Sequence, residues 1–292
     1  MLFSIIQIFW HTFMNYFGMM MELADKSRFV TLLISCTMSM AFILNIQCGR
    51  AVFHSFRYWV TNKSINSKLN RYASPVDIVT RFACQLQSKH SLVWTHYYDL
   101  PLAMLLENNG STVILRGCYP PNSVPHLSGG DLRGRYHFVE ANFKWGAMRS
   151  EHSIDGQQFS LELQVLHYCP QQTEYLAISY LFLRTRFKNV PLKQVTENLR
   201  CIRWAGSSIE LPPFELGTLL RTFGRNYYSY QGTYDNGEMM LPVTWLIDPQ
   251  LSHVRFQQVI EFTALCGKDG SRIMSSGRVE KSLGNRSLLF YS

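Results

Sequence analysis

The sequence has few charged residues and no paired cysteine motif, and both shortages limit what the chain can be. Only 16% of its 292 residues are Asp, Glu, Lys or Arg, whereas 47% are apolar, a composition typical of a globular protein rather than a disordered one. The seven cysteines are an odd number and contain no CxxC pair, which argues against a zinc ribbon or a disulfide framework. We expect most of them to be small buried apolar residues.

The motifs of several common enzyme classes are also missing. The chain contains no HExxH, GxSxG or GxxxxGK segment, so zincin, serine-hydrolase and P-loop chemistry have no support. The formal net charge is +8, and no acidic residue lies between Asp25 and Asp77. The basic residues nevertheless form no long run and have no accompanying base-reading or stacking element, which nucleic-acid recognition needs. We therefore expect no nucleic-acid partner.

Two long uncharged stretches lie near the N-terminus, at residues 2–21 and 29–48. Each is long enough to cross a bilayer. The second, which follows Lys26 and Arg28, fits a signal anchor, a cleaved signal sequence or the second arm of a hairpin. We expect residues 1–48 to be a hydrophobic membrane or targeting leader with one or two such segments, and residues 49–69 to be a basic linker.

The sequence leaves the side of the membrane open. Excess basic residues at 49–72 favour a cytosolic position for that flank. Glycosylation sequons begin at Asn62, Asn109 and Asn285, and such sites matter only in the lumen. Membrane association through residues 2–21 and 29–48 is one hypothesis; a cytoplasmic protein, or a secreted one after leader cleavage, are the alternatives.

From about residue 70, short alternating apolar runs are separated by Gly, Pro and Asn turns, a pattern typical of a large antiparallel sheet. Strands are predicted at residues 111–115, 136–145, 159–166, 175–183 and 243–247. Helices are predicted at residues 192–200, 214–220 and 251–266, the last starting after Asp248-Pro249. We predict a mainly β (α+β) fold for residues 70–292, with a large, twisted, mostly antiparallel central sheet and a few flanking helices.

One predicted strand has the geometry of a metal site without the residues for one. Because alternate residues of a strand face the same side, Glu140, Asn142 and Lys144 share a face, and Gln164 can face them from the strand 159–166. Two positions at i and i+2 with a third on the neighbouring strand suit three donors around one ion. Amides and an ammonium, however, do not replace three neutral imidazoles around zinc.

An ordered set of short motifs extends over residues 70–292. It comprises Ser74-Pro75-Val76-Asp77-Ile78, Asn109-Gly110, Ser128-Gly129-Gly130, Gly134-Arg135-Tyr136, Trp145-Gly146, Ser150-Glu151-His152, Asp155-Gly156, Glu162-Leu163, His167, Leu211-Pro212-Pro213-Phe214, Tyr228, Tyr230, Gly232 and Thr244-Trp245. In this order they resemble the α-class carbonic anhydrases. The resemblance implies that fold, and it implies internal hydrogen bonding for Glu151, Glu162, His152 and His167.

The same resemblance places Asn142, Lys144 and Gln164 at the family's three zinc-ligand positions. In the family, zinc lowers the pKa of bound water so that hydroxide can attack carbon dioxide. The family ligands are histidines, so all three have changed. We therefore expect no zinc and no other cofactor.

Supporting positions differ from the family as well. The family's proton-shuttle histidine corresponds to Ser111, which does not titrate near neutral pH. Its gatekeeper threonine corresponds to Asp235, followed by Asn236, and an ionised carboxylate cannot donate a hydrogen bond to Glu151. The glutamine usual on the ligand strand is Glu140. These losses resemble the catalytically inactive carbonic anhydrase-related proteins.

An isolated buried ammonium is costly or loses its proton, so Lys144 needs an explanation. One hypothesis places it roughly where zinc would lie, paired with Asp235 or Glu151. In the alternative, the side chain extends to the mouth of the cavity and keeps its ammonium in water.

These residues support three functional hypotheses. The first is a non-catalytic binding or interaction module that takes an unknown protein partner or a small polar or anionic ligand. The second is residual zinc-dependent carbonate dehydratase or esterase activity through an unrecognised ligand set. The third is a chain that retains little function.

Overall fold

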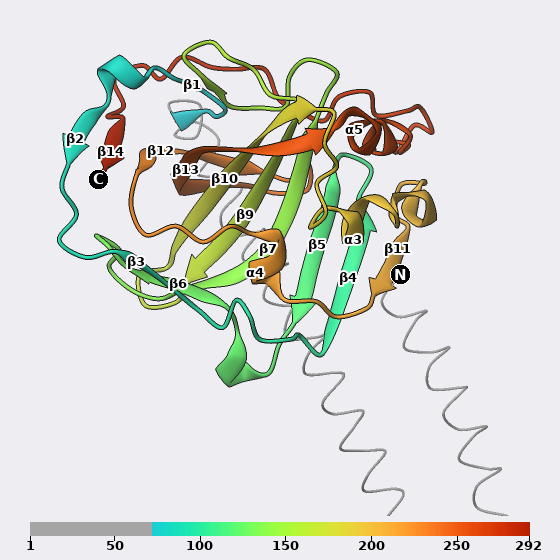
Figure 1. Cartoon of the computed structure of the whole chain (residues 1–292), viewed down its shortest axis with the longest axis horizontal. Helices are drawn as coiled ribbons and strands as arrows, with labels where there is room; N and C mark the ends of the chain where they lie inside the picture. Colours follow the sequence, from blue (N-terminus) through green and yellow to red (C-terminus); the bar gives the residue numbers. More distant parts are fainter. Residues whose placement is uncertain (1–71) are drawn as a thin grey trace, which may run out of the picture. The chain divides into compact units, whose positions relative to one another are not determined.

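Fourteen strands and a few short helices form residues 72–292, the part of the chain that the computed structural model describes (Figure 1). The strands are β1 (Asp77–Ile78), β2 (Cys84–Leu86), β3 (Leu92–Thr95), β4 (Ala103–Asn108), β5 (Val113–Cys118), β6 (His126–Gly129), β7 (Tyr136–Trp145), β8 (Ser153–Ile154), β9 (Leu161–Cys169), β10 (Glu174–Thr185), β11 (Ser208–Leu211), β12 (Tyr227–Asp235), β13 (Met240–Arg255) and β14 (Leu289–Tyr291). The α-helices are α3 (Lys193–Thr196), α4 (Leu216–Leu219) and α5 (Phe256–Thr263), and 3-10 helices lie at Thr80–Phe82, Pro121–Ser123 and Leu199–Ile202.

The expectations for the N-terminal part lie outside the described residues. They concern the leader at 1–48 with its stretches 2–21 and 29–48, the linker at 49–69 and the sequon at Asn62. Within residues 72–292, none of the helices has both the length and the apolar character needed to span a bilayer.

Most of the described strands belong to one sheet, with the order β11-β4-β5-β7-β9-β10-β13-β12-β14-β2. Strand β6 also pairs with β7, and β3 pairs with β6, so the sheet has twelve strands in all. Within it the β10–β13 and β14–β2 pairs are parallel and the other pairs are antiparallel. The predicted mainly β fold with a large, mostly antiparallel sheet is therefore confirmed. Figure 1 shows β5, β7, β9 and β10 running side by side through its centre.

Both faces of the central strands are buried, each against its own apolar cluster. On β10, Ile178 belongs to the larger cluster and Ala177 to the smaller, and on β13 Leu246 and Trp245 divide in the same way. Because alternate residues of a strand point to opposite faces, two clusters drawn from neighbouring positions must lie on opposite sides of the sheet. The central strands are accordingly apolar on both sides, as buried strands are.

The predicted element boundaries are partly right. The strand at 136–145 coincides with β7, but the helix predicted from residue 251 is wrong at its start, because β13 continues to Arg255. The pairing of β10 with β13 shifts register between the Tyr180–Asp248 and Phe182–Ser252 partners. Pro249 lies in that irregularity, where its missing N–H costs no ladder bond.

The helix predicted at 192–200 is also wrong in extent. It is divided into α3 and the 3-10 helix at Leu199–Ile202. The helix predicted at 214–220 shortens to the single turn of α4.

The expected burial of the cysteines holds for only some of them. Cys169 and Cys266 are buried, Cys118 is partly exposed, and Cys84 and Cys201 are exposed. These five described cysteines are all free thiols.

His167 of β9 is buried among apolar residues and hydrogen-bonds the Tyr97 hydroxyl, with 2.6 Å between Oη and Nε2. Burial lowers the pKa of His167 to about 3. In the unfolded chain a histidine has a pKa of about 6.5, so between the two pKa values the imidazole is protonated in the unfolded chain and neutral in the folded one. The stability that the neutral His167 contributes is therefore fully present above pH 6.5 and is lost as the pH falls.

We expect the free energy of unfolding to decrease by about 1.4 kcal/mol per pH unit on this account, hence by about 2 kcal/mol between pH 6.5 and 5. The variant His167→Gln, which still accepts from Tyr97, should flatten the slope measured by urea denaturation across this range. The exposed His253→Asn is the control and should keep the wild-type slope. Equal slopes for wild type and His167→Gln would contradict this role for His167.

Candidate functional site

Four buried polar side chains lie on one face of the β7–β9 pair. Asn142 is directly opposite Gln164, and Lys144 is directly opposite Glu162. As whole residues, all four are at most 3% exposed. On β9 the same face carries Leu166, which belongs to the smaller apolar cluster. The site is thus a polar patch set in an apolar wall, where each polar group needs a partner.

The Gln164 amide lies between two buried carboxylates. Its nitrogen donates to Glu151 Oε2 at 2.9 Å and to Glu162 Oε1 at 2.8 Å. Both partners only accept when ionised, which fixes the amide nitrogen toward them. Among the described residues, Gln164 Oε1 and Asn142 Oδ1 have no hydrogen-bond partner. The amide nitrogen at position 164 is therefore fully engaged by Glu151 and Glu162, and the amide oxygen is the group left without a partner.

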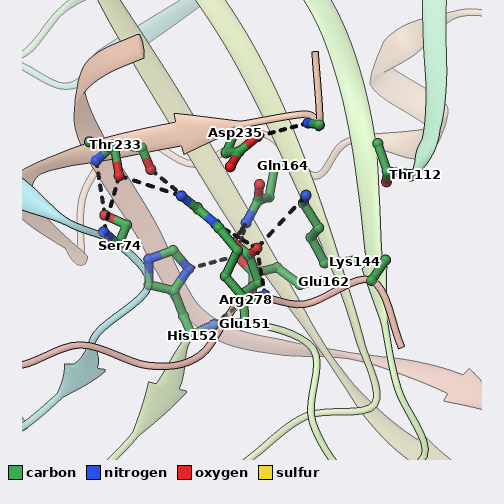
Figure 2. Close-up of polar contacts among 12 residues, drawn as sticks. Ser74, Thr112, Lys144, Glu151, His152, Glu162, Gln164, Thr233, Asp235 and Arg278 are labelled. Atoms are coloured by element: carbon green, nitrogen blue, oxygen red, sulfur yellow. Dashed lines mark hydrogen bonds and ion pairs between the residues drawn. The ribbon is translucent and has the colours of Figure 1, made fainter. Parts of the chain in front are cut away.

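Arg278, from the C-terminal segment, neutralises Glu151. Its Nε and Nη2 lie 2.9 Å and 3.0 Å from the two carboxylate oxygens of Glu151, and its backbone N–H donates to Oε1 at 3.1 Å. Figure 2 shows the guanidinium extended between Glu151 and Thr233, whose carbonyl accepts from Nη2 at 3.2 Å. Burial raises the pKa of Glu151, but the cations of Arg278 and Lys144 outweigh burial and hold that pKa well below its usual range.

The Lys144 ammonium also points toward Glu151 (Figure 2). Its Nζ lies 3.8 Å from Glu151 Oε1, and the side chain is 4% exposed. Of the two arrangements considered for Lys144, this is the buried pair and not the extension into water. Burial lowers the pKa of Lys144, and the negative charges of Glu151 and Asp235 offset part of that effect.

Glu140 has its own cation. Arg116 of β5 binds it through Nε at 3.1 Å and Nη2 at 3.0 Å. The other carboxylate oxygen accepts from Tyr234 at 3.0 Å and from Asn236 at 2.6 Å. Because Arg116 neutralises the Glu140 carboxylate, this glutamate does not act as the counter-charge of Lys144. Glu140 and Asn236 therefore form a second polar group beside the one that contains Lys144, Glu151 and Gln164.

Asp235 ends β12 and Ser111 lies in the turn between β4 and β5, and these two segments are tied together. The Asp235 carboxylate accepts from the N–H of Gly237 at 2.7 Å, and Asn109 Nδ2 donates to the Asn236 carbonyl at 2.7 Å. A Cβ on Gly237, whose φ is +84°, would lie 2.3 Å from the Cβ of Ser111. Only glycine allows this close approach, so Ser111 packs directly against the turn that carries Asp235.

His152 completes the buried network. Its backbone N–H and Nδ1 bind the two oxygens of Glu162 at 2.8 Å and 2.7 Å, and Nε2 meets the Tyr230 hydroxyl at 2.6 Å. Burial raises the pKa of Glu162, but the interaction with His152 outweighs it and lowers that pKa. Glu162 and His152 thus make the internal hydrogen bonds expected from the resemblance.

Comparison with known proteins agrees with this fold. A family model described as eukaryotic-type carbonic anhydrase matches residues 54–292. The chain belongs to the eukaryotic-type carbonic anhydrase family. It is 26% identical to carbonic anhydrase 7 of Mus musculus over 215 residues, which cover 68% of this chain and 80% of the relative.

Two rabbit relatives show similar agreement. Carbonic anhydrase 1 of Oryctolagus cuniculus is 27% identical over 187 residues, covering 58% of this chain and 79% of the relative. Carbonic anhydrase 4 of the same species is 26% identical over 235 residues, covering 74% of each chain. The resemblance seen in the motifs is therefore confirmed at the level of the family.

Sequence reasoning missed Arg278 and Arg116. Neither belongs to a motif, and each lies far along the chain from the glutamate it binds. The available signal was indirect: buried carboxylates at 140, 151 and 162 need more positive charge or donors than Lys144 supplies. Such a deficit shows that partners exist without identifying them.

Proposed function

We propose that this carbonic anhydrase family member does not hydrate carbon dioxide and acts instead as a binding or interaction module, as the resemblance to the carbonic anhydrase-related proteins implies. The observation that carries the proposal is the buried Lys144 ammonium, 3.8 Å from Glu151. It stands at one of the three positions that the resemblance assigns to zinc ligands. A fixed ammonium at this position pairs with the negative charge of Glu151, which would otherwise help to balance the charge of a metal ion.

Zinc, which the family implies, does not fit this donor set. Zinc in proteins is held by imidazole nitrogens, thiolates or carboxylates, whereas Asn142 and Gln164 are amides and Lys144 has no lone pair while protonated. Both N–H donors of Gln164 are engaged by Glu151 and Glu162, so its neutral amide oxygen is all that it can offer an ion. A dication would also be repelled by Lys144 and by Arg278 on the far side of Glu151.

The proposed alternative to catalysis is binding. Asn142 Oδ1 and Gln164 Oε1 are buried acceptors without a partner among the described residues, and Lys144 has no carboxylate oxygen within hydrogen-bond distance. These groups match a small polar or anionic ligand that accepts from the ammonium and donates to the amides. Binding of a protein partner at the outer surface is the other function that is compatible with a site that does not catalyse the reaction.

Carbon dioxide hydration tests the proposal directly. We expect the site around Lys144, with or without added zinc, to leave the reaction at its uncatalysed rate, because Asn142, Lys144 and Gln164 hold no metal that would ionise a bound water near pH 7. The check is a stopped-flow hydration assay run beside mouse carbonic anhydrase 7 as the active control. Zinc-dependent hydration that a sulfonamide inhibits would overturn the proposal in favour of residual enzymatic activity.

Membrane association through residues 2–21 and 29–48 remains part of the proposal, as does the division into a leader at 1–48, a linker at 49–69 and a domain at 70–292. A cytoplasmic or secreted location is the alternative.

A further inference from the structure

Three histidines lie in a row at one edge of the sheet, apart from the buried cluster. His126 of β6 pairs directly with His137 of β7. The flanking Phe138 N–H donates to the Pro125 carbonyl at 2.8 Å, so the histidines form a non-hydrogen-bonded cross-strand pair, the kind whose side chains approach most closely. Their ring centroids are 5.2 Å apart. The sheet itself therefore holds two imidazoles side by side.

His96, in the turn after β3, brings a third ring to this pair. Its centroid lies 5.8 Å from that of His126. Strand β3 pairs with β6 and ends at Thr95, which is opposite His126. His96 follows with a left-handed φ of 63°, outside the alternation of the strand, and its ring lies beside that of His126. All three side chains are partly exposed, which makes them accessible to an ion in solution.

Two of the rings have Nδ1 partners that favour the tautomer a metal ligand needs. Nδ1 of His96 meets Asp99 Oδ2 at 2.7 Å, and Nδ1 of His126 meets the Val124 carbonyl at 3.2 Å. Both partners are acceptors, so the Nδ1 atoms carry the protons and the Nε2 lone pairs are free. Metal-binding histidines commonly donate their second N–H to a carboxylate or a backbone carbonyl in this way.

The charge state also favours a ligand role. Burial lowers the pKa of His126 and of His137, and the nearby Arg135 lowers both further. Both rings are therefore neutral at pH 7, as metal binding requires. Arg135 opposes a bound cation, but its side chain is exposed and its charge is screened, while Asp99 supplies a negative charge beside His96.

We propose that His96, His126 and His137 form a surface site for one divalent transition-metal ion such as Zn²⁺ or Cu²⁺. As the side chains stand, no group of three or more His, Cys, Asp or Glu residues within 72–292 is placed to hold a metal ion. The site thus closes by rotation of the imidazoles about their side-chain torsions, of which χ2 is broad for histidine. None of its residues belongs to the cluster around Lys144.

Titration calorimetry of the chain with Zn²⁺ and with Cu²⁺ tests this site. We expect one ion per chain, with at least about tenfold weaker binding in His126→Asn/His137→Asn and in His96→Asn, and about tenfold weaker binding in Asp99→Asn, which removes the partner of His96. The exposed His253→Asn is the matched control and should bind as the wild type does. Affinity that is unchanged in either the double variant or His96→Asn would overturn the three-histidine site.

A second measurement separates metal binding from a structural role. Without metal, the double variant should melt at the wild-type temperature, while added Zn²⁺ should raise the melting temperature of the wild type only, because the ion binds the folded state. An equal rise in both proteins would place the ion elsewhere and overturn the proposal. The outcome is independent of carbon dioxide hydration, so this site and the proposed silent cavity can fail separately.

Discussion

The triple variant Asn142→His/Lys144→His/Gln164→His is expected to bind one zinc ion, which we expect the wild-type cluster not to bind. Asn142 and Gln164 are direct cross-strand partners, and Lys144 lies two residues along β7 on the same face. Cβ atoms of opposite residues on neighbouring strands are about 5 Å apart, so three imidazoles at these positions converge on one point. Three neutral nitrogens with an open fourth position are the ligand set of a catalytic zinc site.

The size of the effect follows from the change in charge as well as from the ligands. The substitution at 144 removes an ammonium from the centre, and Glu151 keeps its bidentate partner Arg278. We expect a gain in zinc affinity of at least about 1000-fold, or about 4 kcal/mol, which is roughly a third of the 10–16 kcal/mol that structural zinc sites reach. Hydration should stay slow, since Ser111 and Asp235 remain in the supporting positions.

Two controls sharpen the test. The triple variant is measured by calorimetry in the His126→Asn/His137→Asn background, so that the proposed surface site does not contribute. The double variant Asn142→His/Gln164→His retains Lys144 and should bind zinc no better than the background, because the ammonium still occupies the centre. If the triple variant fails to gain affinity while remaining folded, the positions assigned to the ligands by resemblance are wrong.

The sequence predicted those features of the β7–β9 site that depend on local patterns. The alternation along residues 136–145 located β7 and the shared face of Asn142 and Lys144, and the order of short motifs indicated the family. The boundary errors have a physical cause: Pro249 usually interrupts a strand, but here it lies where the β10–β13 register shifts. Only tertiary pairing reveals that exception.

The charge balance of the site was predictable only in part. The hypothesis named Asp235 or Glu151 as the partner of Lys144, and the structure places Glu151 nearest, with Arg278 as the stronger partner of that carboxylate. Arg116 likewise forms the ion pair with Glu140. Contacts between residues separated by more than a hundred positions, such as Glu151 and Arg278, leave no trace in local spacing. Burial of several carboxylates can be expected from their strand positions, whereas the identity of each counter-charge requires the folded chain.

Replacing Arg278 by alanine should cost about 3–5 kcal/mol in the free energy of unfolding, the usual cost of leaving one member of a buried ion pair alone. Glu151 is fully buried and takes three hydrogen bonds from Arg278, two of them from the guanidinium. In the variant, the backbone N–H at 278, the Gln164 amide and the more distant Lys144 ammonium remain to oppose its charge. Urea denaturation at pH 7 and 25 °C measures the loss.

Arg286→Ala is the matched control for this variant, because Arg286 lies in the same C-terminal segment and donates to three backbone carbonyls, of Gln231, Ser282 and Leu283. It leaves no carboxylate unpaired and should cost clearly less. The double variant Glu151→Gln/Arg278→Ala should recover part of the stability lost in Arg278→Ala, because the neutral amide no longer needs a counter-charge. A loss in Arg278→Ala no greater than in Arg286→Ala, or no recovery in the double variant, would show that Glu151 is not held ionised by Arg278. Recovery of stability in the double variant would show that the cations of this cluster neutralise its own buried carboxylates. That is the arrangement expected of a site that holds no metal.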